Sequence, residues 1–151
     1  QGPITIEKID RNMHTIRNQR IVYVTETISP DKHLIYVHKN ALTKIAPNRD
    51  TVMSMQHKIM YQGKMIPADE LYQKCNNISK INYSGETLYN ILLENHSYML
   101  VNNLIVETLD PNNLMGQIFN IVSANEESLK PTVMKMVKNK LKQRELNQLI
   151  E

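Results

Sequence analysis

The 151-residue sequence contains one cysteine, Cys75, and this scarcity excludes two kinds of structure. One monomer can form neither an internal disulfide nor a zinc site built from several cysteines. Tryptophan is absent and phenylalanine occurs once, whereas methionine occurs nine times and tyrosine seven times. With 41% hydrophobic residues, the chain can still bury the core of one compact domain.

Long hydrophobic runs are also missing. Nothing approaches the roughly 20 apolar residues that a helix needs to cross a bilayer. The chain does not begin with a positively charged stretch followed by an apolar core, so we expect no signal peptide and no transmembrane segment within it. Gln1-Gly2-Pro3 resembles the remnant of an engineered cleavage tag, so residues 1–3 are left out of the fold, which is expected to begin at Ile4.

Residues 4–109 contain short apolar stretches separated by turn signals, which is typical of an all-β domain. Residues 20–28, RIVYVTETI, are rich in β-branched side chains. The predicted fold is therefore mainly β, with a C-terminal α-helical extension. Strands are expected at residues 4–9, 20–28 and 33–38, twice within 51–71, twice within 80–94 across Ser84-Gly85, and in a hairpin over 97–109 closed by Asn102-Asn103.

The last third of the chain has a different composition. Residues 110–151 are predicted to be a linker and an amphipathic basic helix that Ser128 could cap. From Lys130 onward the charge is +4, against −1 for the rest. The lysine face is by default a solvated helix face. We expect self-association through residues 121–151 as the next alternative, and nucleic acid or an anionic membrane only after it, because no aromatic residues interleave the lysines.

Ser54 and His57 raise the question of chemistry. In a regular strand, residues three apart point to opposite faces, so the two would cooperate only if the backbone turns or bulges at Met55-Gln56. From the residues alone, a structural histidine is the better interpretation.

The order of the motifs changes this interpretation. The first block is Ser54-x-x-His57, then Tyr61-Gln62-Gly63-Lys64 and Pro67-Ala68-Asp69-Glu70-Leu71; the second is residues 89–93 and 95–106; the third is residues 6–13 and 25–28. In this order the blocks resemble the Hint superfamily of hedgehog autoprocessing domains, inteins and bacterial intein-like modules. The resemblance covers residues 4–109 and implies a horseshoe of short strands and hairpins. The closing block is most similar to Hint-type domains in proteins of large DNA viruses, which would place the protein in the host cytoplasm or the virion.

The resemblance also implies roles for individual residues. In the family, an N-terminal Cys or Ser attacks the preceding carbonyl and converts a peptide bond into a thioester or ester. His57 would be the acid/base that protonates the leaving nitrogen, near the point where the chain enters the domain. Ser54 would replace the usual Thr that holds the local geometry, and His96 would correspond to a histidine that assists later steps. The chain's own upstream segment would be the substrate.

Two departures from the family limit the expected activity. The nucleophile's place lies upstream of Ile4, and Cys75 has no matching scissile bond, so we expect residues 1–151 not to cleave themselves. Val106 is followed by Glu107-Thr108 instead of His-Asn, so neither C-terminal cleavage nor splicing is expected. The alternative function is a non-catalytic structural or assembly module of a viral protein, oligomerising through its C-terminal helix.

No cofactor is expected. His14, His33 and His38 could join His57 in a metal site, but their spacing predicts no convergence of the three or four ligands that zinc requires. For His96, which follows Asn95 at a turn, a purely structural role is the better interpretation from the residues alone.

Overall fold

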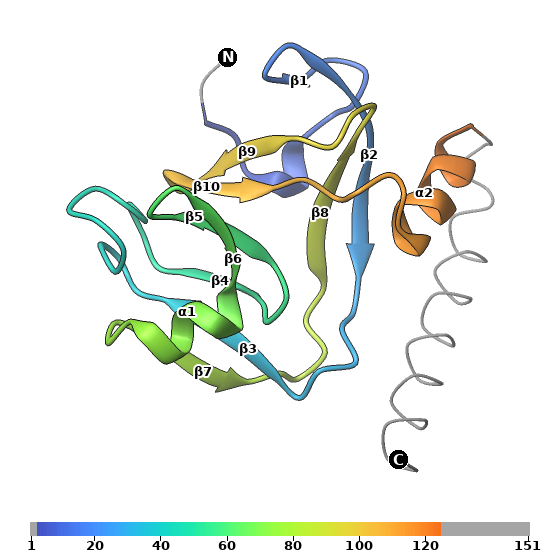
Figure 1. Ribbon diagram of the computed structural model, residues 1–151. Helices are drawn as coiled ribbons and strands as arrows, with labels where there is room; N and C mark the ends of the chain where they lie inside the picture. The colour runs from blue at the N-terminus through green and yellow to red at the C-terminus, as the bar shows by residue number, and fades with distance from the viewer. Residues whose placement is uncertain (1–2, 125–151) are drawn as a thin grey trace. The chain divides into compact units, whose positions relative to one another are not determined.

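The computed structural model describes residues 3–124, which form two compact units. Within these residues, the first unit comprises residues 3–30, 87–97 and 108–124, and the second comprises residues 31–86 and 98–107. The described part of the chain contains ten strands in three sheets, together with helices, so the prediction of a mainly β fold is confirmed (Figure 1). The predicted horseshoe depends on how the two units sit together and stays a prediction.

The first unit is built on a three-stranded antiparallel sheet with the order β1-β2-β8. Its strands are β1 (Thr15–Ile16), β2 (Gln19–Thr27) and β8 (Leu88–Leu93). The long strand β2 matches the β-branched segment singled out in the sequence. The expected strand over residues 4–9 is wrong, because this segment forms the 3-10 turn η1 (Ile6–Lys8). Its amides bond to carbonyls three residues back, from Lys8 to Thr5 at 2.9 Å and from Ile9 to Ile6 at 3.3 Å, instead of to a neighbouring strand.

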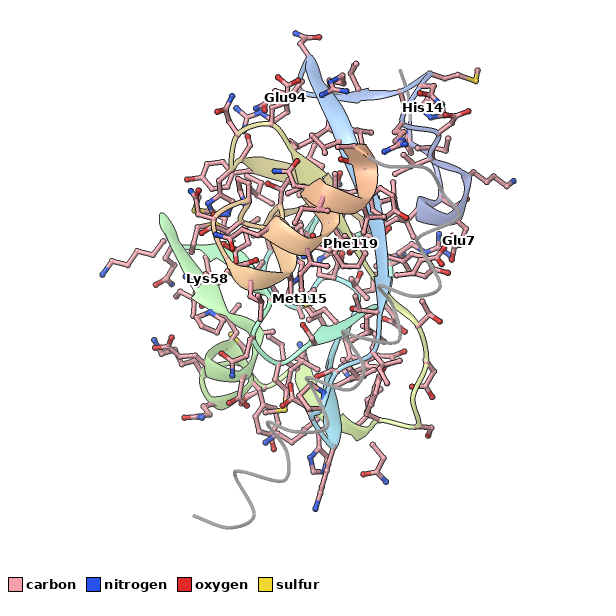
Figure 2. The ribbon with its side chains drawn as sticks, turned by 90° about the vertical axis from the view of Figure 1, so that its right-hand side faces the viewer. Glu7, His14, Lys58, Glu94, Met115 and Phe119 are labelled. Atoms are coloured by element: carbon pink, nitrogen blue, oxygen red, sulfur yellow. The ribbon has the colours of Figure 1, made fainter. Side chains whose placement is uncertain are left out.

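The helix α2 (Leu114–Ala124) contacts β2 and β8 and closes the core of the first unit. Phe119 is fully buried and stacks on Tyr23 of β2, with ring centroids 5.4 Å apart. Figure 2 shows Phe119 and Met115 on α2, next to β2. The predicted C-terminal helical extension is confirmed by α2, which begins earlier in the chain than the helix expected from Ser128. The basic helix expected from Ser128 onward lies outside the described residues.

The second unit contains two antiparallel sheets. One has the order β4-β3-β7 and consists of β3 (His33–Val37), β4 (Thr51–Ser54) and β7 (Ile78–Asn82). The other has the order β6-β5-β10-β9 and consists of β5 (Lys58–Tyr61), β6 (Lys64–Pro67), β9 (Tyr98–Val101) and β10 (Leu104–Glu107). A short helix, α1 (Ala68–Lys74), follows β6 directly. The apolar core of the unit includes four residues that are 0% exposed: Ile35, Val37, Ile59 and Leu71.

The hairpin β9–β10 confirms the turn expected at Asn102-Asn103. Both residues are left-handed, with φ of 51° and 67°, which is the backbone that a two-residue type I′ turn requires. The Asn102 side chain also donates to Thr51 Oγ1 at 2.9 Å. Asparagine therefore closes the hairpin and ties it to β4 of the same unit.

The predicted pairing across Ser84-Gly85 is wrong. Strands β7 and β8 both exist, but β7 pairs with β3 and β8 pairs with β2. They belong to different sheets and different units, so Ser84-Gly85 lies in a connection, not in a hairpin turn.

Candidate functional site

Ser54 and His57 lie at the two ends of a tight turn. Strand β4 ends at Ser54, Met55-Gln56 form the turn, and β5 begins after His57. The His57 amide donates to the Ser54 carbonyl at 3.2 Å, which closes the turn. The alternation of a regular strand therefore does not apply between these residues. The backbone turn that cooperation between them would need is present.

The start of α1 holds this turn in place. Ala68 and Asp69 are the first two residues of the helix, and their amides have no acceptor within it. The Ala68 amide donates to the His57 carbonyl at 2.8 Å, and the Asp69 amide donates to the Met55 carbonyl at 2.9 Å. The donors that every helix leaves unpaired at its N-terminus thus fix the segment that carries His57.

The sequence contains reasons for a helix at this place. Pro67 has φ of −58°, which suits the residue that leads into a helix, and Asp69 and Glu70 put negative charge in the first turn. Ala68 and Leu71 are fully buried and anchor the inner side of the helix. This proline-acid pattern is a known start signal, so α1 and its contact with the His57 turn could have been found in the sequence.

The environment of His57 favours the neutral imidazole. The side chain is partly buried, and burial lowers the pKa of His57 below its ordinary value because the charged form loses hydration. Within residues 3–124, no hydrogen bond to the His57 ring or to the Ser54 hydroxyl is observed. The structure thus brings the two residues together through the backbone, without a hydroxyl–imidazole bond, and leaves the ring nitrogens available to an outside group.

His96 lies in the connection between β8 and β9 and is exposed. It belongs to the first unit, whereas His57 belongs to the second. Cooperation between the two histidines, and the predicted closeness of His57 to the start of the domain, therefore stay predictions.

Within the part of the chain that the structure describes, the remaining histidines do not share hydrogen-bond partners with one another. His14 Nδ1 accepts the Asp10 amide at 2.9 Å, and His38 Nε2 lies 3.0 Å from Ser79 Oγ. Among the described residues, no three His, Cys, Asp or Glu side chains gather in a way that could hold a metal ion. Cys75 is a free, partly buried thiol just after α1.

Asp69 is a further residue of interest beside the turn. One of its carboxylate oxygens is buried without a hydrogen bond, and Lys80 Nζ lies 3.7 Å from that oxygen. Its own backbone amide holds the Met55 carbonyl. The sequence placed Asp69 in the family block but gave it no role.

Two units of antiparallel strands and a helix-anchored turn with a histidine define a β-domain with one candidate acid/base group. The sequence matches the Hint domain family over residues 4–113, and the chain belongs to this family. No curated protein and no solved structure gives a significant match. No helix in the described residues has the length and apolar character to cross a membrane.

Proposed function

We propose that this Hint domain supports self-cleavage of the longer protein at the junction upstream of Ile4, through an N-terminal acyl shift. The observation that carries the proposal is the state of His57. Its backbone is held by a closed turn and by α1, while its partly buried ring makes no hydrogen bond within the described residues. A positioned imidazole without an internal partner suits a group that exchanges protons with a reacting peptide.

The proton balance of the proposed step requires a neutral base at the start. A hydroxyl or thiol attacks the preceding carbonyl, and its proton passes to the neutral His57 ring. The same proton then moves to the amide nitrogen, which leaves as an amine while the ester or thioester forms. The lowered pKa keeps His57 neutral before the attack and makes its protonated form a stronger acid in the second half.

The other two candidate residues have supporting roles in this proposal. Ser54 keeps the turn geometry through its carbonyl, which accepts the His57 amide, and its hydroxyl, unbonded within residues 3–124, contacts the reacting segment. Exposed His96 assists later, when the ester or thioester is resolved by water or another nucleophile. The nucleophile itself is a Cys or Ser in the segment that precedes Ile4. We place the longer protein among those of large DNA viruses, and hence in the host cytoplasm or the virion.

The test is cleavage of the longer protein, including its upstream segment, with and without a mild thiol. We expect two fragments from the wild type and only the full-length chain from His57→Ala. His33→Ala is the matched control, since it removes another partly buried histidine of the second unit. A wild-type protein that stays intact under thiol would refute self-cleavage, and equal cleavage in His57→Ala would refute the role of His57.

A second candidate function is a non-catalytic assembly module, and one feature of α2 favours it. Leu114 and Ile121 lie seven residues apart, which puts them on one side of the helix, and they are 50% and 63% exposed. Light scattering would compare the whole chain with a chain that ends at Ala124 and with Ile121→Lys. A particle with fewer copies in either variant than in the whole chain supports assembly. Loss of binding to mixed DNA in the shortened chain would instead support the nucleic-acid alternative.

A further inference from the structure

Three neighbouring strands of the second unit place an acid, an imidazole and a hydroxyl in a row. Strands β3 and β4 pair Tyr36 with Val52, so His38 and Asp50, two residues further on, lie opposite each other where the pairing ends. On the other side of β3, Tyr36 pairs with Ser79 of β7. Tyr36, His38, Asp50 and Ser79 therefore belong to one face of the sheet β4-β3-β7.

The side chains in this row contact one another. His38 Nε2 lies 3.0 Å from Ser79 Oγ, which is hydrogen-bond distance. The ring of Tyr36 lies against the His38 ring, with centroids 4.6 Å apart and planes inclined by 52°. The imidazole, just past the end of β3, is thus held beside the hydroxyl by an aromatic neighbour on that strand.

Asp50 is fixed as a negative charge at the end of the row, with both of its carboxylate oxygens bonded to groups other than His38. The Tyr36 hydroxyl donates to Asp50 Oδ2 at 2.6 Å and the Lys39 amide donates to Asp50 Oδ1 at 2.7 Å. These hydrogen bonds lower the pKa of Asp50, and the charge of His38 acts in the same direction.

We propose that Ser79 is a nucleophile activated by His38, and that it takes the acyl group of small, unhindered esters. We expect small, unhindered esters as substrates because the pair lies at the surface of the protein. His38 and Asp50 are exposed, and Ser79 is partly buried. A hydroxyl within hydrogen-bond reach of an imidazole is the pair that general-base activation of a nucleophile requires. This activity is separate from the self-cleavage proposed above.

Each step conserves atoms and protons. In the tautomer with the proton on Nδ1, Nε2 of His38 takes the hydroxyl proton as Ser79 Oγ bonds to the ester carbon. The bond to the leaving oxygen breaks, and that oxygen takes the proton from His38. Water then attacks the acyl-Ser79 carbon and gives a proton to His38, and Ser79 Oγ leaves and recovers it. One ester and one water become one acid and one alcohol.

The experiment uses the whole chain with p-nitrophenyl acetate and with a fluorophosphonate label located by mass spectrometry. We expect a burst of p-nitrophenol, one label per chain on Ser79, and loss of both in Ser79→Ala. His38→Ala should slow labelling by about 100-fold, the scale of general-base assistance, and Asp50→Asn should slow it by less. His33→Ala and Ser84→Ala should label like the wild type.

Two results would overturn the proposal. One is a wild-type chain in which Ser79 carries no label after exhaustive treatment, a result that does not depend on the folding of any variant. The other is labelling of Ser79 at the same rate in His38→Ala. Neither result bears on cleavage of the longer protein, because both assays are independent of the upstream junction.

Discussion

The backbone carbonyl of His57 accepts a hydrogen bond from the amide of Ala68 at 2.8 Å, so the candidate acid/base and the first residue of α1 are directly joined. The neighbouring bond from Asp69 to the Met55 carbonyl, at 2.9 Å, makes the attachment a pair. Two bonds in parallel restrain rotation of the turn as well as its position. The geometry at His57 therefore depends on a helix that begins eleven residues later in the chain.

Removing the Ala68 donor should loosen the turn while the helix persists. Ala68→Pro deletes the amide, and proline is tolerated in the first turn of a helix. We expect a loss of about 1–3 kcal/mol in the free energy of unfolding, because the His57 carbonyl loses its partner and the buried site must hold a larger ring. Urea unfolding measures the loss.

Glu70→Pro is the matched control for this change. Glu70 also lies in the first turn of α1, but its side chain is exposed. It should retain more stability than Ala68→Pro, and in the longer protein it should retain more cleavage. Equal losses of stability and cleavage in the two proline variants would mean that they result from disturbing the start of α1, and not from losing the bond to the His57 carbonyl.

The histidine itself should make stability depend on pH. Burial lowers the pKa of His57 in the folded chain below the value of about 6.5 in the unfolded chain, so the unfolded chain binds more protons between the two values. Stability is then fully present above pH 6.5 and falls as the pH drops toward the folded pKa. His57→Gln should lose less stability between pH 7.5 and 5.5 than the wild type. Urea unfolding at the two pH values tests this, and an identical loss in both chains would contradict it.

The packing of α2 should depend on Gly116. A side-chain carbon built at this buried position would collide with the Asp110 carbonyl and lie 2.7 Å from Pro111 Cα. Both obstacles are backbone, so they cannot turn aside as a flexible side chain would. We expect Gly116→Ala to lower the free energy of unfolding by about 1–3 kcal/mol, although alanine favours helices. Gln117→Ala, at the exposed next position, should be neutral or slightly stabilising in the same urea titration.

The sequence could predict the elements whose signals are local. The β-branched run gave β2, and Asn102-Asn103 gave a hairpin because asparagine accepts the left-handed backbone. It could not predict the partners of β7 and β8, since pairing is decided by burial across the whole domain. The packing of α2 was not predictable for the same reason, because Phe119 becomes a core residue only once Tyr23 is in place.

The candidate site was likewise predictable from the sequence only in part. His57 and the need for a turn at Met55-Gln56 were visible in the sequence. A helix start at Pro67 was visible too, although no helix was predicted there. The bond from Ala68 to His57 was not visible, because it joins segments whose distance depends on the fold of β5 and β6. The row of Asp50, His38 and Ser79 was beyond sequence reasoning, since it depends on the register of three strands.

Phe119 should be the largest single contributor of α2 to the stability of the first unit. It is the only phenylalanine in the chain, it is 0% exposed, and it stacks on Tyr23, which is 5% exposed. Phe119→Ala should cost about 3–5 kcal/mol through lost burial and the cavity left behind, and Phe119→Leu should cost less because it refills part of that space. Urea unfolding of both variants, beside Ile121→Ala at an exposed position of the same helix, gives the comparison. A Phe119→Ala loss no larger than that of Ile121→Ala would mean that α2 contributes little to the core of the protein in solution.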